Sequence, residues 1–208
     1  MEEKSISERE SLQIITDMIA KTKDNYLGSG KIMLMWGYIV MAVSVAVWLL
    51  LATTRNGLWN WLWFAIPVVG WIGTLINDRK EKRNHGGVKT YSDKVTSRLW
   101  TIVGLSEAAA AAVCLSFTLF LNVNCWIAML VYSYIATPLA ETAQGLIINE
   151  KSLTVGGIIG LAIGIVTLCL VSAGLKLVAV WYMPLFILGF ICMMIIPGHI
   201  INSKYGNK

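Results

Sequence analysis

Six long apolar runs are the feature that most limits what this chain can fold into. Each is roughly 20 residues long, the length that crosses the ~30 Å hydrocarbon layer of a bilayer as an α-helix. A transmembrane β-barrel would alternate apolar and polar residues, and these runs do not alternate. The sequence therefore predicts an all-α, polytopic membrane protein, a six-transmembrane-helix bundle with spans at residues 32–52, 58–76, 99–121, 125–148, 153–175 and 177–197.

Composition supports this class. Only 14% of the 208 residues are charged and 56% are hydrophobic, whereas soluble domains carry about 25% charged residues. We expect a cytoplasmic amphipathic helix and linker over residues 1–30, a transmembrane domain over 31–198 and a cytoplasmic tail over 199–208. No cleavable signal peptide is expected, because the start is charged and the first long apolar run begins only at Ile32.

The basic residues predict the orientation in the membrane. Of the 17 Lys and Arg residues, all but Arg55 and Lys176 fall on one side of the predicted spans. Positive charge resists translocation, so this side and both termini should be cytoplasmic. The net charge of +5 is then explained by topology, and no nucleic-acid partner is expected.

Two segments are expected to touch the membrane surface or a partner. Ser7 and Glu10 form a capping box that opens a helix over 7–27. Its apolar stripe could lie on anionic lipids of the inner leaflet, or dock a cytoplasmic partner or a second copy. A basic loop over 77–98 offers the same two uses. The candidate surface residues are Leu12, Ile15, Ile19, Arg79, Lys80, Lys82 and Arg83.

The beginning of the chain shows a family resemblance. The segments Ser5–Ile15 and Leu34–Tyr38 resemble the start of a family of small, uncharacterised, multi-span bacterial inner-membrane proteins. The resemblance covers about the first fifth of the chain. It implies a bacterial inner-membrane location, and it implies no catalytic or binding residue because no activity is established for that family.

Two glutamates inside apolar runs are the main candidates for a functional site. Glu107 lies in the third run and Glu141 in the fourth, and the short link Asn122-Val123-Asn124 should make these helices antiparallel neighbours. At ~1.5 Å rise per residue both acids lie about 10–12 Å from the inner boundary. We therefore expect Glu107 and Glu141 to face each other inside the bundle.

The fourth run adds polar residues around Glu141. Helical spacing predicts one polar face formed by Tyr134, Thr137, Glu141 and Gln144. An ionised acid at mid-membrane costs on the order of 2.5–3.5 kcal/mol, and no basic residue lies at that depth. At least one acid should then be protonated when no cation is bound. Together with Glu107, this face could bind a small cationic or protonatable solute.

Gly156, Gly160 and Gly164 form a small-residue ridge in the fifth run. Such a ridge lets two membrane helices approach closely. We expect it to pack against a neighbour within the chain, with the 108–112 alanine run of the third span as the suggested partner. A homodimer seam is the alternative.

Two functions remain open from the sequence. The first is a small permease or channel with a proton- or cation-sensitive carboxylate site between the third and fourth spans. The second is a non-transporting scaffold, sensor or accessory subunit that acts through its cytoplasmic helix and basic loop. The acids could also be neutral groups that only hydrogen-bond between helices, or Glu141 could reach towards the cytoplasmic interface.

An enzyme is not expected. The Gly104–Ala108 segment misses the GxSxG pattern at its last position, and neither histidine lies mid-span to serve a serine. His85 and His199 give no metal-ligand spacing, so no metal and no cofactor are expected. The four cysteines show no CxxC spacing and are interpreted as small apolar residues.

Overall fold

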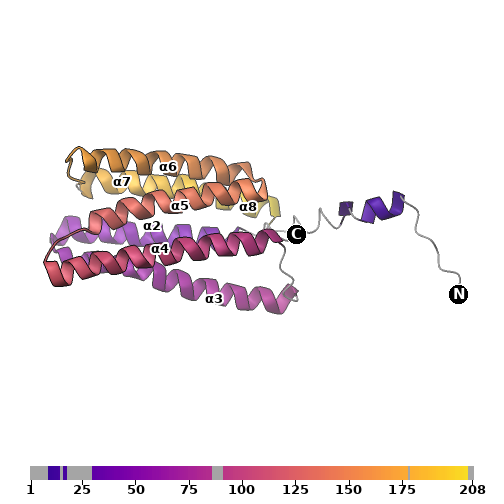
Figure 1. Ribbon diagram of the computed structural model, residues 1–208, viewed down its shortest axis with the longest axis horizontal. Helices are drawn as coiled ribbons and strands as arrows, with labels where there is room; N and C mark the ends of the chain where they lie inside the picture. Colours follow the sequence, from indigo (N-terminus) through magenta and orange to yellow (C-terminus); the bar gives the residue numbers. More distant parts are fainter. Residues whose placement is uncertain (1–8, 15, 18–29, 86–90, 178, 206–208) are drawn as a thin grey trace.

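Each predicted apolar run forms a long helix in the computed structural model, which describes residues 9–14, 16–17, 30–85, 91–177 and 179–205 (Figure 1). The 3₁₀-helix η1 and the π-helical segment η2 continue directly into α3 and α8. The elements are α2 (Lys31–Thr54), η1 (Gly57–Phe64), α3 (Ala65–His85), α4 (Tyr91–Leu121), α5 (Trp126–Ile148), α6 (Lys151–Ser172), α7 (Ala179–Phe190), η2 (Ile191–Ile195) and α8 (Ile196–Tyr205).

Five helical segments in the described part of the chain are long and apolar enough to cross a membrane. They are Lys31–Thr54, Gly57–Lys80, Lys94–Leu121, Lys151–Ser172 and Trp181–Lys204. The fourth predicted run, now α5, is not among these segments, although it has 23 residues. Its tyrosines, threonines, glutamate and glutamine lower its hydropathy, so α5 is set apart by the same residues that made it a candidate site.

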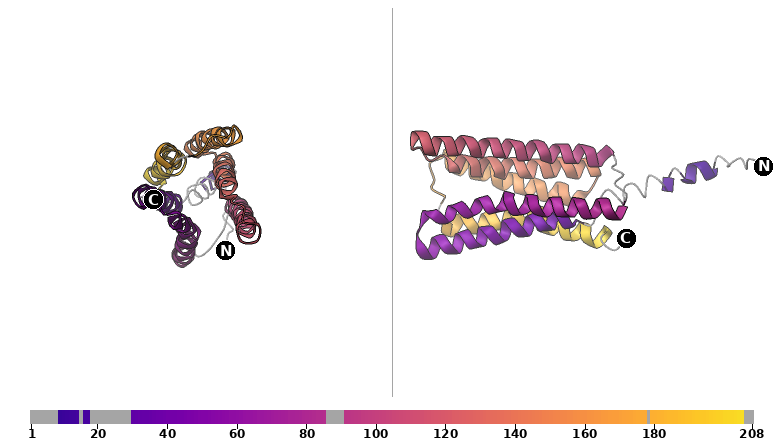
Figure 2. Two further views of the ribbon diagram at one scale, coloured as in Figure 1. Left: turned by 90° about the vertical axis from the view of Figure 1, so that its left-hand side faces the viewer. Right: turned by 90° about the horizontal axis from the view of Figure 1, so that it is seen from below.

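The helices follow one another around an open arc when the molecule is viewed end-on (Figure 2). Contacts join α3 to α2, α2 to α7, α7 and η2 to α6, α6 to α5, and α5 to α4. Helices α3 and α4 therefore stand at the two ends of the arc. The bundle has an Asn122 end, where α4 is followed by α5, and a Glu150 end, where α5 is followed by α6.

The closest helix contact joins α5 and α6, and glycines make it possible. A methyl group on Gly164 would collide with the Tyr134 carbonyl oxygen, and a Cβ on Gly157 would lie 2.8 Å from the Pro138 carbonyl oxygen. The ridge thus packs within the chain, but its suggested partner was wrong. Gly160 lies against Pro138 and Met193, and Gly156 against η2 and Pro197, whereas the 108–112 run belongs to α4 on the far side of α5.

An aromatic cluster fills the inner side of the arc. Tyr134 of α5 stacks on Phe186 of α7 with ring centroids 4.9 Å apart, and its hydroxyl donates to the Phe186 carbonyl oxygen at 3.1 Å. Trp36, Trp63 and Trp100 pack against this cluster from α2, η1 and α4. Burying a hydroxyl is tolerated here because it has an acceptor. The cluster holds α5 against α7, which is not its neighbour in sequence.

The candidate surface segments are described only in part. Residues 9–14 and 16–17 are helical and Leu12 is 64% exposed, while Ile15 and Ile19 lie outside the described residues. The predicted basic loop is instead largely helical, because α3 continues to His85 and α4 begins at Tyr91. Arg79 and Lys80 are exposed on α3, and Lys82 and Arg83 follow in its last turns.

We expect the contact between α5 and α6 to be sensitive to one methyl group. Gly164→Ala should lower the thermal unfolding midpoint of the detergent-solubilised protein, because overpacking against backbone costs about 1–3 kcal/mol. Gly104→Ala is the matched control: a Cβ added there would have no neighbouring group within 4 Å, so it should be neutral or slightly stabilising. Equal midpoints for the two variants would contradict the close contact.

Candidate functional site

Side-chain hydrogen bonds join α4 and α5 at two levels. The Thr137 hydroxyl donates to Oε1 of Glu107 at 2.9 Å, and the Trp100 indole N–H donates to Oε1 of Gln144 at 2.7 Å. The two hydrogen-bonded pairs lie seven residues apart along each helix, which is two turns of an antiparallel helix pair. Glu107, Thr137 and Gln144 therefore belong to one seam between α4 and α5.

Tyr134 and Glu141 lie on a different stripe of α5, so the predicted single polar face was wrong. Both side chains are buried, with exposed fractions of 1% and 0%. Tyr134 turns towards α7, through its bond to the Phe186 carbonyl oxygen. Of the five candidate residues, Glu107, Thr137 and Gln144 thus form the seam, whereas Tyr134 and Glu141 form a buried stripe on α5. The two groups are separate because α5 packs against α4 on one side and against α6 on the other.

Glu107 and Glu141 do not meet as expected. Glu107 is half-buried and bonded to Thr137, whereas both carboxylate oxygens of Glu141 lack a hydrogen-bond partner in the described structure. Because Glu107 is opposite Thr137, Glu141 lies one turn further along α5 and is rotated out of the seam. The prediction of similar depth agrees with this register, but the prediction that the two acids face each other was wrong.

Pro138 leaves one backbone oxygen of α5, that of Tyr134, without its usual helical donor, and this oxygen lies against Gly164 of α6. Proline has no N–H, so the carbonyl of Tyr134 loses its usual donor four residues later. A helical side chain leans back over the preceding turn, so that of Glu141 extends towards the turn containing Pro138. This part of α5 therefore combines a buried carboxyl group with a backbone carbonyl released from the helix.

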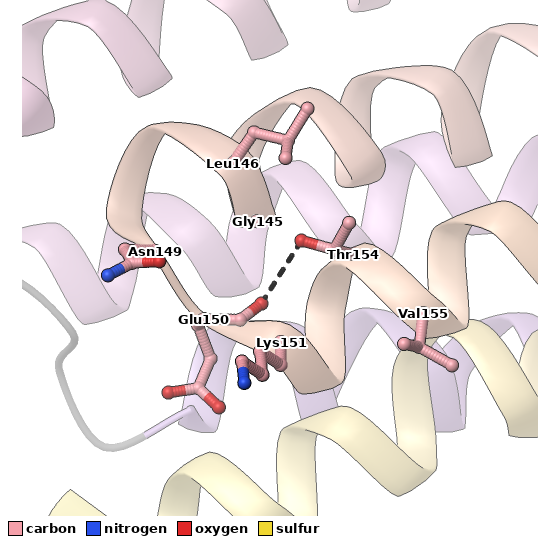
Figure 3. A pocket seen from close by; sticks show the side chains of 7 residues that line it. All are labelled: Gly145, Leu146, Asn149, Glu150, Lys151, Thr154 and Val155. Atoms are coloured by element: carbon pink, nitrogen blue, oxygen red, sulfur yellow. Dashed lines mark hydrogen bonds between the residues drawn. The ribbon is translucent and has the colours of Figure 1, made fainter.

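A shallow pocket marks the Glu150 end, which the sequence reasoning did not single out (Figure 3). Asn149 ends α5 in the left-handed region with φ 55°, and the Glu150 N–H bonds back to the Gly145 carbonyl oxygen at 2.9 Å. This is a helix-ending turn. The pocket is lined by Gly145, Leu146, Asn149, Glu150, Lys151, Thr154 and Val155.

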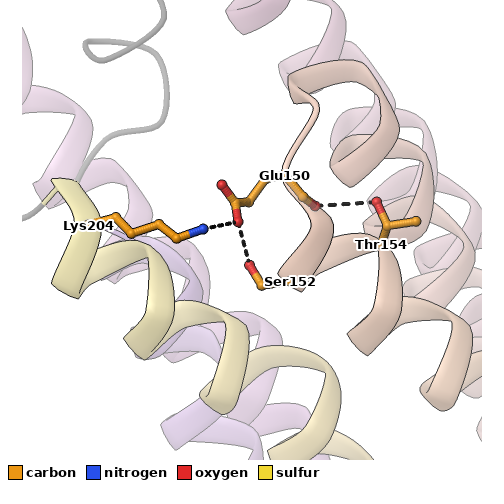
Figure 4. A network of polar contacts seen from close by, with 4 residues as sticks. All are labelled: Glu150, Ser152, Thr154 and Lys204. Carbon is orange, nitrogen blue, oxygen red and sulfur yellow. Dashed lines mark hydrogen bonds and ion pairs between the residues drawn. The ribbon is translucent and has the colours of Figure 1, made fainter.

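Glu150 ties this corner to the C-terminal helix (Figure 4). Its Oε1 accepts hydrogen bonds from Lys204 Nζ at 2.7 Å and from the Ser152 hydroxyl at 3.0 Å. Burial raises the pKa of Glu150, but the bonds from Lys204 and Ser152 and the lysine charge outweigh burial and hold the pKa below its usual range. This carboxylate is already paired, which makes it a structural clamp.

Metal binding has no support in the described residues, which contain no group of three or more His, Cys, Asp or Glu side chains able to hold an ion. The candidate residues offer carboxyl groups, hydroxyls and the Gln144 amide. Glu107 can exchange hydrogen-bond partners at the seam. Glu141 can take up a proton or a cation, because none of its oxygens is already used.

The Glu150 clamp should contribute stability only where the carboxylate is ionised. Glu150→Gln should lower stability at pH 7 by about 0.5–1 kcal/mol, since Lys204 is half exposed and solvent screens the pair. A folded-state pKa below the unfolded value means that this contribution is lost as the pH falls through the folded value. The difference in thermal midpoint should therefore shrink below pH ~4. Asp78→Asn, which removes the same charge from α3, is the matched control and should leave the thermal midpoint at pH 7 closer to that of the parent than Glu150→Gln does.

Comparison with known proteins found no matching family model, no matching curated protein and no matching solved structure. The resemblance of the N-terminal segment therefore stays an expectation from the sequence.

Proposed function

We propose that this chain is a small permease or channel of the bacterial inner membrane, with a proton- or cation-sensitive carboxylate at Glu141. In this proposal α5 joins the five apolar helical segments as a sixth span, shielded by α4 and α6 on its two sides. Its substrate would be a small cation or a protonatable solute. The proposal needs no cofactor.

One observation carries the proposal: Glu141 is fully buried, and both of its oxygens lack a partner in the described structure. A buried polar group without a hydrogen bond costs about 1–3 kcal/mol, and an ionised one at mid-membrane costs more. A purely structural acid would have a donor, as Glu107 has in Thr137. An acid without a donor fits a group that binds a proton or cation during its working cycle.

The residues around Glu141 would have two different roles, one in access from solvent and the other in orienting α5. Glu107 is half-buried and bonded to Thr137, so it can serve as the more accessible acid between solvent and Glu141. Gln144 is held by Trp100, and Tyr134 by Phe186. These two hydrogen bonds hold α5 in the rotation that its contact with α6 sets, and with it the direction of Glu141.

The distribution of basic residues supports an orientation with both termini in the cytoplasm. Alternating helix directions gather the start of α2, the end of α3, the start of α4 and the corner between α5 and α6 at the Glu150 end. Eight of the 17 basic residues belong to these segments, and Lys204 of α8 lies beside Glu150, whereas Arg55 and Lys176 belong to the Asn122 end. Under the positive-inside rule the Glu150 end then faces the cytoplasm.

Cation-coupled proton flux tests the proposal directly. The full chain is reconstituted into vesicles containing a pH-sensitive dye, and gradients of Na⁺, K⁺ or tetramethylammonium are imposed. We expect at least one gradient to change the internal pH, and Glu141→Gln, which cannot exchange a proton, to return the signal to that of protein-free vesicles. Glu107→Gln, which keeps an acceptor for Thr137, should retain partial flux. Equal flux in the parent and Glu141→Gln would contradict the proposal.

The stability of a second variant separates a functional acid from a structural one. Glu141→Leu should raise the thermal unfolding midpoint, because it removes a buried group whose lack of partners costs about 1–3 kcal/mol. Glu107→Leu is the control, and it should lower the midpoint because it breaks the bond from Thr137. If Glu141→Leu is instead strongly destabilising, Glu141 has a structural partner and the argument for transport loses its main support.

The open arc favours a second candidate, a scaffold or accessory subunit that assembles through α3 and α4. In the spans formed by these two helices only 6% of the most apolar window is buried, against 50% in the span from Trp181 to Lys204. A second copy of this chain or another membrane protein could cover these faces, as could lipid. A scaffold requires no flux, so this candidate remains if the vesicle experiment gives none.

A further inference from the structure

Cys114 of α4 and Cys125, which precedes α5, lie against each other near the Asn122 end. The Cys114 thiol contacts the Cys125 carbonyl oxygen at 3.4 Å, and the Cys125 thiol contacts the Cys114 carbonyl oxygen at 3.8 Å. Such reciprocal contact requires the two side chains to lie side by side.

The way α4 ends explains why two cysteines 11 residues apart come together. Asn122 adopts the left-handed conformation with φ 54°, and the Val123 N–H bonds back to the Phe117 carbonyl oxygen at 3.2 Å. This bond joins residues six positions apart, one more than in the Schellman arrangement, and it closes the end of α4. The chain then runs back along α4. As a result Cys125 lies beside Cys114, and not beside Leu121 at the end of α4.

We propose that Cys114 and Cys125 are a redox-active dithiol that closes to an intramolecular disulfide by exchange with a disulfide-class oxidant. Both are free thiols in this structure. In the first step one thiolate attacks a sulfur of the oxidant, forms a mixed disulfide and releases one oxidant thiol. In the second step the other thiolate attacks the mixed disulfide and releases the second oxidant thiol. The protein thus loses two protons and two electrons, and the oxidant disulfide is reduced to two thiols.

Burial sets the order of these steps. Cys125 is partly exposed, whereas Cys114 is only 5% exposed. The incoming oxidant therefore reaches Cys125 first, and Cys114 resolves the mixed disulfide from inside the helix pair. The bond would fasten the start of α5 to α4, two turns beyond the bond from Thr137 to Glu107. This inference does not depend on the proposed transport function.

The test counts thiols in the full-length protein in membranes. After incubation with oxidised glutathione the protein is denatured, treated with an alkylating reagent and weighed by mass spectrometry. Of its four cysteines, four should be alkylated before oxidation and two afterwards. Chymotryptic cleavage between Cys114 and Cys125, for example after Phe117, should give two fragments that separate only on reduction.

Cysteine variants test the two steps of the exchange separately. Cys114→Ala should hold a stable glutathione adduct at Cys125 that reductant removes, because the resolving thiol is missing. The double variant Cys169→Ala/Cys192→Ala, which keeps the proposed pair, should lose both of its remaining alkylatable thiols. Four alkylated cysteines after oxidation, a bond to Cys169 or Cys192, or a bond between two copies of the chain would each overturn the proposal.

Discussion

Lipid exerts no hydrophobic force that would press two helices together, so the contact between α5 and α6 depends on shape. Glycines on α6 remove the side chains that would otherwise meet Tyr134 and Pro138, and Gly145 of α5 does the same opposite Thr154. The two backbones then approach closely along most of their length. This contact sets the rotation of α5, and the rotation decides which of its polar side chains meets α4 and which is turned into the bundle.

That rotation explains the unequal surroundings of the two acids. Thr137 and Gln144 face α4 and find partners there, in Glu107 and Trp100. Tyr134 finds an acceptor on α7, at the carbonyl of Phe186. Glu141 falls between these directions, and no residue in the described part of the chain donates to its carboxyl oxygens. One helix thus carries three satisfied polar side chains and one unsatisfied carboxyl group within about three turns.

Local features of the sequence were enough to predict the helices. Apolar run length and the turn at residues 122–124 depend on residues close together in the chain, and α4 and α5 end and begin within one residue of the predicted bounds. The helix against which each surface packs depends on residues far apart in the chain, so it could not be predicted in the same way. The glycine ridge predicts a close contact, but the same spacing fits any small surface, so it could not distinguish α5 from α4.

The division of the candidate residues between two stripes of α5 also could not be predicted from the sequence. Spacing places residues 134, 137, 141 and 144 within a face about 80° wide, and a face of that width can meet two different helices. Only the packing on both sides of α5 shows that Thr137 and Glu141 are separated. The thiol pair depends similarly on the return of the chain after Asn122. Counting residues from the turn would place Cys125 beside Leu121 and leave Cys114 without its neighbour.

The backward turn at Asn122 leaves the tip of α4 standing beyond its partner helix. The apolar run of this helix, residues 99–121, has 23 residues, about 35 Å of helix, against ~30 Å of hydrocarbon. Such an excess is a hydrophobic mismatch, which a bilayer accommodates through helix tilt or local thickening. Because α4 stands at one end of the arc, such a mismatch would act on the lipids beside α4, next to the seam that bears Glu107.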